Sequence, residues 1–280
     1  MNTALSTPLP AAWDTLPAAP GPLTQLGRCL AADYCKLRRT PALWLALAGG
    51  ALPVLLNFAI FFFKGQYLVK PGENPWPQYV SMSWQTASLL LLPLFVVMLT
   101  GLLANVEHRA AGWKHLHALP VGRGAVYVSK LLVVLQLTVV AHVLYALLLL
   151  AAGIVLGWVR PELGFQTKSV ELGAVALMLG HTFLATLGML GVQYVAALWW
   201  RGFVGPLALG IGGIVSALTL LRWEHVDLIP YAAPARALQA MNRQTLLVDP
   251  ALTPAEWYSL AWFGAAVLLG YALLQLRRAE

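Results

Sequence analysis

A short polar stretch between two long apolar runs holds most of the side chains in this chain that could do chemistry or bind a partner. Trp113 and His117 fall on one helical stripe of it, and Pro120 ends the pattern. Exposed tryptophan and arginine are typical anchors of a protein–protein contact, although the same side chains also suit lipid headgroups. We therefore predict a helix over residues 107–118 that docks on another protein, with headgroup contact as the alternative. Its candidate contact residues are Glu107, Arg109, Trp113, Lys114, Leu116 and His117.

Two histidines, His142 and His181, interrupt long apolar runs and are the next candidates for chemistry. An ionisable residue inside a membrane is a functional hypothesis by default. Neither histidine has an acidic partner in register along its own run, so we expect neutral, hydrogen-bonded packing. An integral-membrane enzyme or a secondary transporter that uses these histidines is the alternative hypothesis.

Several motifs of catalysis and nucleotide binding do not occur in the sequence. It has no Gly-x4-Gly-Lys-[Ser/Thr], no His-Glu-x-x-His and no Gly-x-Ser-x-Gly. A chain without a P-loop is expected to bind no nucleotide itself. We therefore predict a protein that is not an enzyme and holds no cofactor or metal, so any ATP-driven step needs a second chain.

Six apolar runs must position these residues, and each approaches or exceeds the ~20 residues that a helix needs to cross the bilayer. The chain is 59% hydrophobic and only 10% charged, which leaves too little polar surface for a soluble globule of 280 residues. The predicted fold is an all-α integral membrane protein with six transmembrane helices. The runs are residues 43–63, 84–106, 126–156, 172–199, 203–221 and 257–276.

The distribution of charge predicts the orientation of these helices. If the N-terminus is inside, 11 of the 18 lysines and arginines fall on the inner side, although the outer loops are longer. Positive residues collect on the cytoplasmic side of membrane proteins. We therefore expect both termini, and residues 105–123, on the cytoplasmic side of the cell's inner (plasma) membrane.

The segment before the first run divides into two parts. Residues 1–22 hold five prolines and no positive charge, which predicts a disordered cytoplasmic tail. Residues 23–39 repeat leucines at helical spacing, with Arg28, Lys36 and Arg39 on the opposite face. This pattern predicts an amphipathic helix along the inner leaflet, and a cytoplasmic extension of the first span is the alternative.

Small residues mark the fifth run. They let helices approach closely in lipid, so they suit either a dimer seam or packing within the chain. The glycines concerned are Gly205, Gly210, Gly212 and Gly213.

The outer segment 222–256 is too polar to cross the bilayer. Thr253-Pro254 resembles a helix cap followed by a first-turn proline, so we expect the last helix to begin there.

The pattern Glu-x-Arg-x-x-x-Trp-Lys-x-x-x-x-Leu-Pro-Val, from Glu107 to Val121, resembles the inner loop of type-two ABC transporter permeases. Within that group it is most similar to the lantibiotic-immunity and bacitracin-resistance permeases. The resemblance covers residues 23–280 and implies a coupling helix that docks on a separate ABC ATPase, which binds ATP and Mg. It also implies a connecting helix over 23–39 and a homodimer or heterodimer with a second permease. The implied function is antibiotic resistance by an exporter of hydrophobic or amphiphilic substrates, such as membrane-inserted peptide antibiotics.

Overall fold

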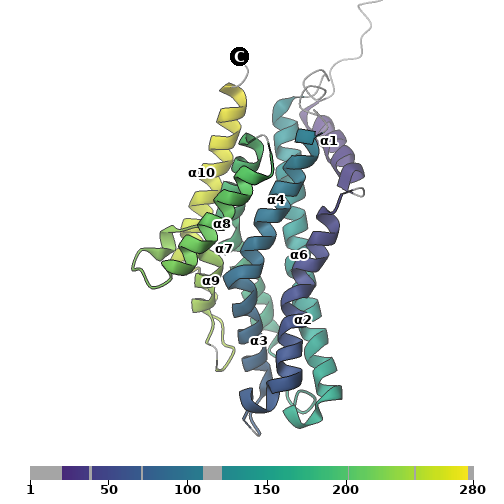
Figure 1. The fold of residues 1–280 in the computed structure, drawn as a ribbon, viewed down its shortest axis with the longest axis vertical. Coiled ribbons are helices and arrows are strands. Elements are labelled where there is room, and N and C mark those ends of the chain that lie inside the picture. Colours follow the sequence, from purple (N-terminus) through teal and green to yellow (C-terminus); the bar gives the residue numbers. More distant parts are fainter. Residues whose placement is uncertain are drawn as a thin grey trace, which may run out of the picture.

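Long helices run side by side along the length of the protein in the computed structural model (Figure 1). The structure describes residues 21–37, 40–70, 72–109, 122–200, 202–242 and 244–276, without the side chains of residues 42–43 and 106–109. Within these ranges there is no strand, only an isolated bridge between Met241 and Val248. The longer helices are α1 (Pro22–Leu37), α2 (Ala42–Leu68), α3 (Pro75–Thr86), α4 (Leu92–Arg109), α6 (Arg123–Val159), α7 (Leu172–Trp199), α8 (Val204–Thr219) and α10 (Pro254–Leu276). The short ones are η1 (Ala87–Leu91), η2 (Pro161–Leu163), η3 (Val226–Leu228), α9 (Ala233–Arg236) and η4 (Ala237–Ala240).

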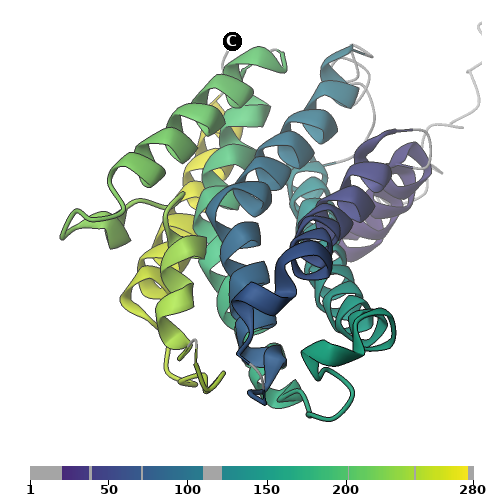
Figure 2. The ribbon, with the colours of Figure 1, turned by 60° about the horizontal axis from the view of Figure 1, so that its bottom comes forward.

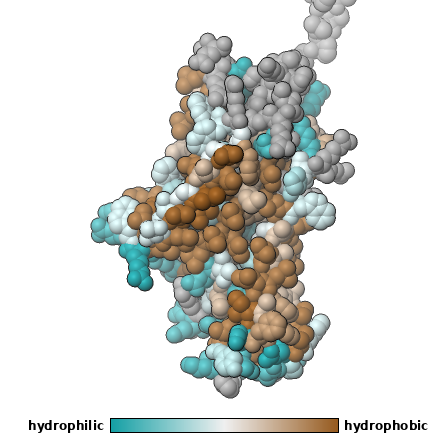
Figure 3. All heavy atoms as spheres, in the orientation of Figure 1, coloured by the Kyte–Doolittle hydropathy of each residue, from teal (hydrophilic) through white to brown (hydrophobic). Residues whose placement is uncertain are grey.

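Five helical stretches in the described parts of the chain are long and apolar enough to cross a membrane. They have 25, 31, 37, 28 and 23 residues and include α2, α3–α4, α6, α7 and α10. The sixth expected span corresponds to α8, an apolar helix of 16 residues, which is shorter than the ~20 that a perpendicular span needs. The protein is therefore a multi-pass helical membrane protein, and a sixth crossing remains a prediction. Apolar residues dominate the middle of the face in Figure 3, as a lipid-facing surface requires.

The second span begins earlier than its apolar run. Helix α3 starts at Pro75, where the side chain of Asn74 accepts a hydrogen bond from the Trp76 N–H at 3.1 Å. Its first turns contain polar residues, but Trp76 and Tyr79 are buried against aromatic side chains of the chain itself. The apolar run predicted from hydropathy starts only at Trp84, because hydropathy reports how polar a residue is and not whether it is buried.

A π-helical turn, η1, joins α3 to α4. The N–H of Leu92 bonds to the carbonyl of Ala87, five residues back, and Pro93 follows directly. Proline has no N–H, so the ordinary bond from residue 93 to the carbonyl of Leu89 cannot form. The wider turn lets the helix continue through this break as one 31-residue stretch.

Helices α4 and α7 lie between the pair α2 and α6 on one side and the pair α8 and α10 on the other (Figure 2). Helix α10 packs closely on α7 because Gly188 lacks a side chain. A Cβ there would lie 2.9 Å from Cα of Ser259, and the Ser259 hydroxyl accepts a hydrogen bond from the Gly188 N–H at 2.8 Å. The C-terminal end of α10 and helix α1 lie at the same end of the bundle (Figure 1).

The segment 222–256, predicted to lie on the outer side, returns to the bundle instead of crossing it. Helices α9 and η4 pack on α7. The last span begins at Pro254, as predicted, although the Thr253 hydroxyl makes no capping hydrogen bond among the described residues; instead the side chain of Glu256 accepts a hydrogen bond from the Thr253 N–H at 2.6 Å. This contact is the return half of a capping box.

Candidate functional site

Helix α1 lies along the first turns of α6, at the end of the bundle from which the polar loop departs. The side chain of Gln25 accepts a hydrogen bond from the Gly122 N–H at 2.9 Å. Further along both helices, the Tyr34 hydroxyl donates to the side chain of Gln136. Residue numbers increase along both helices from the first contact to the second, so α1 and α6 run parallel. The two helices are held together from residue 122 to residue 136. Helix α1 therefore belongs to the bundle, and its location along the inner leaflet remains a prediction.

Asp33 is the strongest link between these two helices. One carboxylate oxygen accepts from the Ser129 hydroxyl at 2.6 Å, and the other lies 3.1 Å from Nζ of Lys130. The side chains of Asp33 and Lys130 are each only 12% exposed, so the pair is largely shielded from solvent. A shielded ion pair that also has a hydroxyl donor fixes helix register more strongly than an exposed pair.

Asp33 was not among the contact residues predicted from the sequence, although its position in the sequence contains a signal for a buried partner. Asp33 stands seven residues after Leu26 and four before Leu37, which places it on the apolar face of α1. An acidic residue on an apolar stripe needs a buried partner. The basic residues predicted for the other face agree with this geometry, since Arg28 and Lys36 are exposed, while Arg39 lies outside the described residues.

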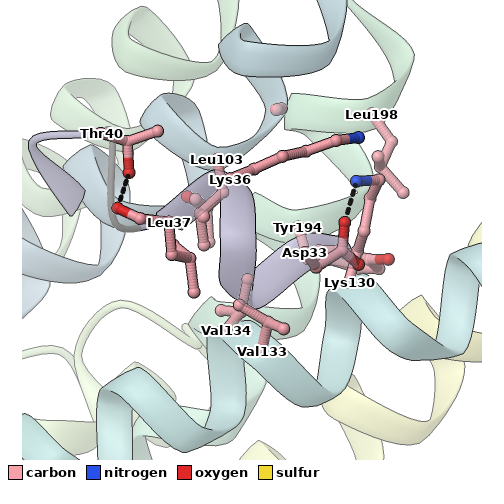
Figure 4. A pocket seen from close by; sticks show the side chains of 12 residues that line it. Asp33, Lys36, Leu37, Thr40, Leu103, Lys130, Val133, Val134, Tyr194 and Leu198 are labelled. Carbon is pink, nitrogen blue, oxygen red and sulfur yellow. Dashed lines mark hydrogen bonds and ion pairs between the residues drawn. The ribbon is translucent and has the colours of Figure 1, made fainter. Parts of the chain in front are cut away.

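A pocket opens where α1 meets α4, α6 and α7, and we call it the junction pocket (Figure 4). It comprises about 480 Å³ of space between atoms, part of which is open to solvent. Lys130 and Asp33 form one wall, and Leu103 of α4 and Tyr194 of α7 line it as well. Four helices therefore meet directly beside the point where the chain leaves α4 and re-enters α6.

The predicted coupling helix is described only at its start. Glu107 and Arg109 lie in the last turn of α4, and their side chains are not described. Trp113, Lys114, Leu116 and His117 lie outside the described residues, in the stretch 110–121. The structure thus shows the two ends of this loop, at Arg109 and Gly122, and leaves its partner contacts as predictions.

Cys29 lies on α1, and its thiol is close enough to Asp33 of α1 and Lys130 of α6 to be affected by their charges. Partial burial, and then the negative charge of Asp33, raise the pKa of Cys29 above its usual value. Cys35 is exposed, and both cysteines are free. Among the residues that the structure describes, no three His, Cys, Asp or Glu side chains gather as metal ligands would.

The glycines of α8 divide between two environments. A Cβ on Gly210 would lie 2.4 Å from Val97 of α4, and one on Gly213 would lie 2.6 Å from the Tyr231 ring. A Cβ on Gly205 would lie 3.0 Å from the Trp200 ring, whereas one on Gly212 would meet no atom within 4 Å. Three of the four glycines therefore serve packing within the chain, and Gly212 faces outward.

The two membrane histidines are both buried and hydrogen-bonded, and one of them pairs with an acid that lies outside its own run. His181 does have an acidic partner, because its Nδ1 lies 2.7 Å from Oε1 of Glu256, and its Nε2 lies 2.9 Å from the Asp249 carbonyl. Glu256 is 75 residues away in sequence and reaches His181 only because α10 packs on α7. His142 bonds through Nδ1 to the carbonyl of Thr138 at 2.8 Å.

Similarity to known proteins extends over much of this bundle. The family model described as "ABC-2 family transporter protein" matches residues 29–216, which span α1 beyond its first turns, α2 to α7 and nearly all of α8. Comparisons with curated proteins and with solved structures gave no match.

Proposed function

Since the chain belongs to the ABC-2 transporter family, we propose that it is the permease subunit of an ATP-driven exporter of hydrophobic or amphiphilic substrates. Permeases of this family normally pair with an ABC ATPase. The ATPase would bind ATP and Mg, because this sequence has no P-loop. Membrane-inserted peptide antibiotics, as handled by the lantibiotic-immunity and bacitracin-resistance permeases, are the substrates that the loop sequence favours.

The observation that carries this proposal is the junction of α1 with α6 beside the polar loop. Asp33 and Gln25 tie α1 to the start of α6, and α4 lies across the junction pocket from them. A movement of residues 107–118 would therefore be transmitted to α4 and α6 together, and to α7 through the packing of α4 and α6 on it. These contacts suit a coupling helix, because the movement of an ATPase must be transmitted to several spans at once.

The proposed topology has six crossings, with α8 as a short, tilted sixth span and both termini in the cytoplasm of the inner membrane. The positive-inside asymmetry of the loops supports it. The outward-facing Gly212 and the exposed apolar side chains of α8 suit a seam with a second permease, identical or different. A membrane-impermeant maleimide that labels a cysteine introduced at His115 in intact cells, after Cys29 and Cys35 are replaced by serine, would refute this orientation.

The coupling role is tested with Trp113→Ala. Truncating an aromatic anchor typically costs about 2 kcal/mol or more of binding energy, which is roughly a thirtyfold loss of affinity. We expect Trp113→Ala to keep normal permease levels in the membrane but to lose co-purification of the ATPase and transport. Lys114→Ala should have a milder effect that depends on salt, because a rim charge is screened.

The matched control is Trp158→Ala, since Trp158 is 69% exposed near the other end of α6. It should retain the ATPase and transport. If Trp113→Ala behaves like Trp158→Ala, the loop contacts only headgroups and the proposed coupling role is wrong.

A further inference from the structure

A second pocket lies in the middle of the bundle, where breaks in two spans face each other. Its lining includes Pro53 of α2, Ser88 of the π-helical turn η1, and His142 near the middle of α6. It comprises about 380 Å³ of space between atoms, including an open side. We call it the midspan pocket. A π-helical turn within a long helix is frequently found at a functional site.

Three polar atoms of this lining have no hydrogen-bond partner among the described residues. They are Oγ of Ser88, Nε2 of His142 and the hydroxyl of Tyr145, in residues that are 1%, 6% and 7% exposed. The neighbouring hydroxyls behave differently, because those of Thr138 and Thr182 donate to the carbonyl four residues back at 2.8 Å. A buried polar atom without a partner is unfavourable, and it is most costly in the dry interior of a membrane protein.

The protonation of the His142 ring determines which kind of group can hydrogen-bond to its Nε2. Its Nδ1 faces the carbonyl of Thr138, and a carbonyl can only accept, so Nδ1 carries the hydrogen. On the neutral ring Nε2 is then an acceptor and needs a donor. Ser88 can donate to the oxygen of the same guest, since a hydroxyl is both donor and acceptor.

The rest of the lining restricts the guest further. Leu92, Phe95 and Ala141 are apolar, and no Asp, Glu, Lys or Arg among the described residues lines the pocket. Trp84 and Thr182 are already bonded to each other at 2.8 Å. A charged headgroup would therefore have no counter-ion there, whereas an apolar chain that ends in a hydroxyl fits both parts of the wall.

We propose that the midspan pocket binds a neutral hydroxyl group, which donates to Nε2 of His142 and accepts from Ser88. Two sources share this chemistry, the hydroxyl of an uncharged amphiphile that enters from the bilayer and a water molecule. If the hydroxyl belongs to an amphiphile, the pocket identifies uncharged amphiphilic alcohols as a class of substrate. This part of the inference rests on the proposed function.

The test uses the full-length permease in lipid nanodiscs without any ATPase, and 3-azioctanol as a photoreactive alcohol. We expect labelling of residues that line the pocket, displaced by octanol at least tenfold better than by octane. His142→Phe keeps a ring against Phe183, with which His142 makes an edge contact, and should reduce labelling about tenfold, the effect of one lost hydrogen bond. Ser88→Ala is the milder second variant if His142→Phe does not fold.

Ser216→Ala is the matched control, because Ser216 is an exposed hydroxyl that donates to the Gly212 carbonyl. It should label like the wild type. Transfer of magnetisation from water protons to the ¹⁵N-labelled His142 ring reports the other source. Water contact at Nε2 without alcohol labelling would identify water as the hydroxyl that the pocket binds.

Three outcomes overturn the inference: octane competes as well as octanol, folded His142→Phe and Ser88→Ala both label like the wild type, or neither alcohol nor water reaches His142. Because no ATPase is present, these outcomes leave the coupling role untouched. Conversely, a permease that binds the alcohol but never co-purifies with an ATPase would refute the proposed function and keep the site.

Discussion

Replacing His181 by phenylalanine should destabilise the protein strongly, because it removes the partner of a buried carboxylate. Glu256 is fully buried, with 0% of its side chain exposed, and His181 is 4% exposed. After the substitution the Thr253 N–H would be the one remaining hydrogen-bond donor to the Glu256 carboxylate among the described residues. Breaking a buried pair by removing one member typically costs about 3–5 kcal/mol, so we expect a loss of about 3 kcal/mol in the free energy of unfolding.

A double-mutant cycle separates this pair from its surroundings. Glu256→Gln keeps the shape and a hydrogen-bonding oxygen, so it should cost less, about 1–2 kcal/mol. The double variant should cost less than the sum of the two single changes, because His181→Phe no longer leaves a carboxylate unpaired. We expect a coupling energy of at least about 1 kcal/mol.

The measurement is unfolding of the purified permease by sodium dodecyl sulfate in mixed micelles, followed by tryptophan fluorescence. His225→Phe is the matched control, because His225 and Glu224 form an exposed pair with side chains 58% and 80% exposed. An exposed pair contributes little, so this variant should unfold like the wild type. If His181→Phe is as stable as His225→Phe, the contact with Glu256 does not hold α10 on α7 and the reasoning fails.

Three further predictions concern helix packing and the α1–α6 junction. Gly50→Val should lower stability by about 1–3 kcal/mol in the same unfolding assay, because a Cβ there would already lie 3.0 Å from the backbone of α6. Lys130→Ala should speed proteolysis of α1, because Asp33 loses its shielded ion-pair partner. Maleimide should modify Cys29 more slowly than Cys35, because Cys29 is partly buried and its pKa is raised. Raising the pH above about 8.5, the usual pKa of an exposed thiol, should narrow that difference in rate, because an ordinary thiol is then mostly ionised while the thiolate fraction of Cys29 still grows.

Each of these predictions has a control within the chain. A Cβ on Gly264 would meet no atom within 4 Å, so Gly264→Val should be tolerated where Gly50→Val is not. Lys70 pairs with Glu73 in an exposed position, so Lys70→Ala should leave proteolysis unchanged. Equal behaviour of either variant and its control would refute the corresponding argument. Equal rates for the two cysteines at neutral pH would show that the packing of α1 on α6 does not shield Cys29.

Much of the fold was predictable because its causes are local in sequence. The run 172–199 coincides with α7 (Leu172–Trp199), since an apolar stretch of that length can satisfy its backbone in lipid only as a helix. The start of α10 at Pro254 was predicted from the Thr253-Pro254 pair, in which proline suits the first turn of a helix. Hydropathy was less informative where polarity and burial diverge, as at Trp76 and Tyr79 in the first turns of α3.

The candidate sites were predictable only in part. Spacing predicted that Arg28 and Lys36 lie on one face of α1, and both are exposed; the polar loop as a place for a partner stays a prediction. Spacing did not identify Asp33 as the link to α6, although its position on the apolar stripe was visible. Nor could it place Ser88 and His142 in one pocket, because that depends on how η1 and α6 pack.

The sequence by itself determined the membrane character, the positions of the long helices and the bounds of α7, because hydrophobic length acts within a few turns of the chain. Tertiary structure alone decided which polar groups meet. Asp33 pairs with Lys130 across 97 residues and His181 with Glu256 across 75, and either acid could have remained exposed had its helix packed elsewhere. In a membrane protein a polar group on a helix face must find a partner or water. The packing of α1 on α6 and of α10 on α7 supplied those partners, and no pattern within one helix contained them.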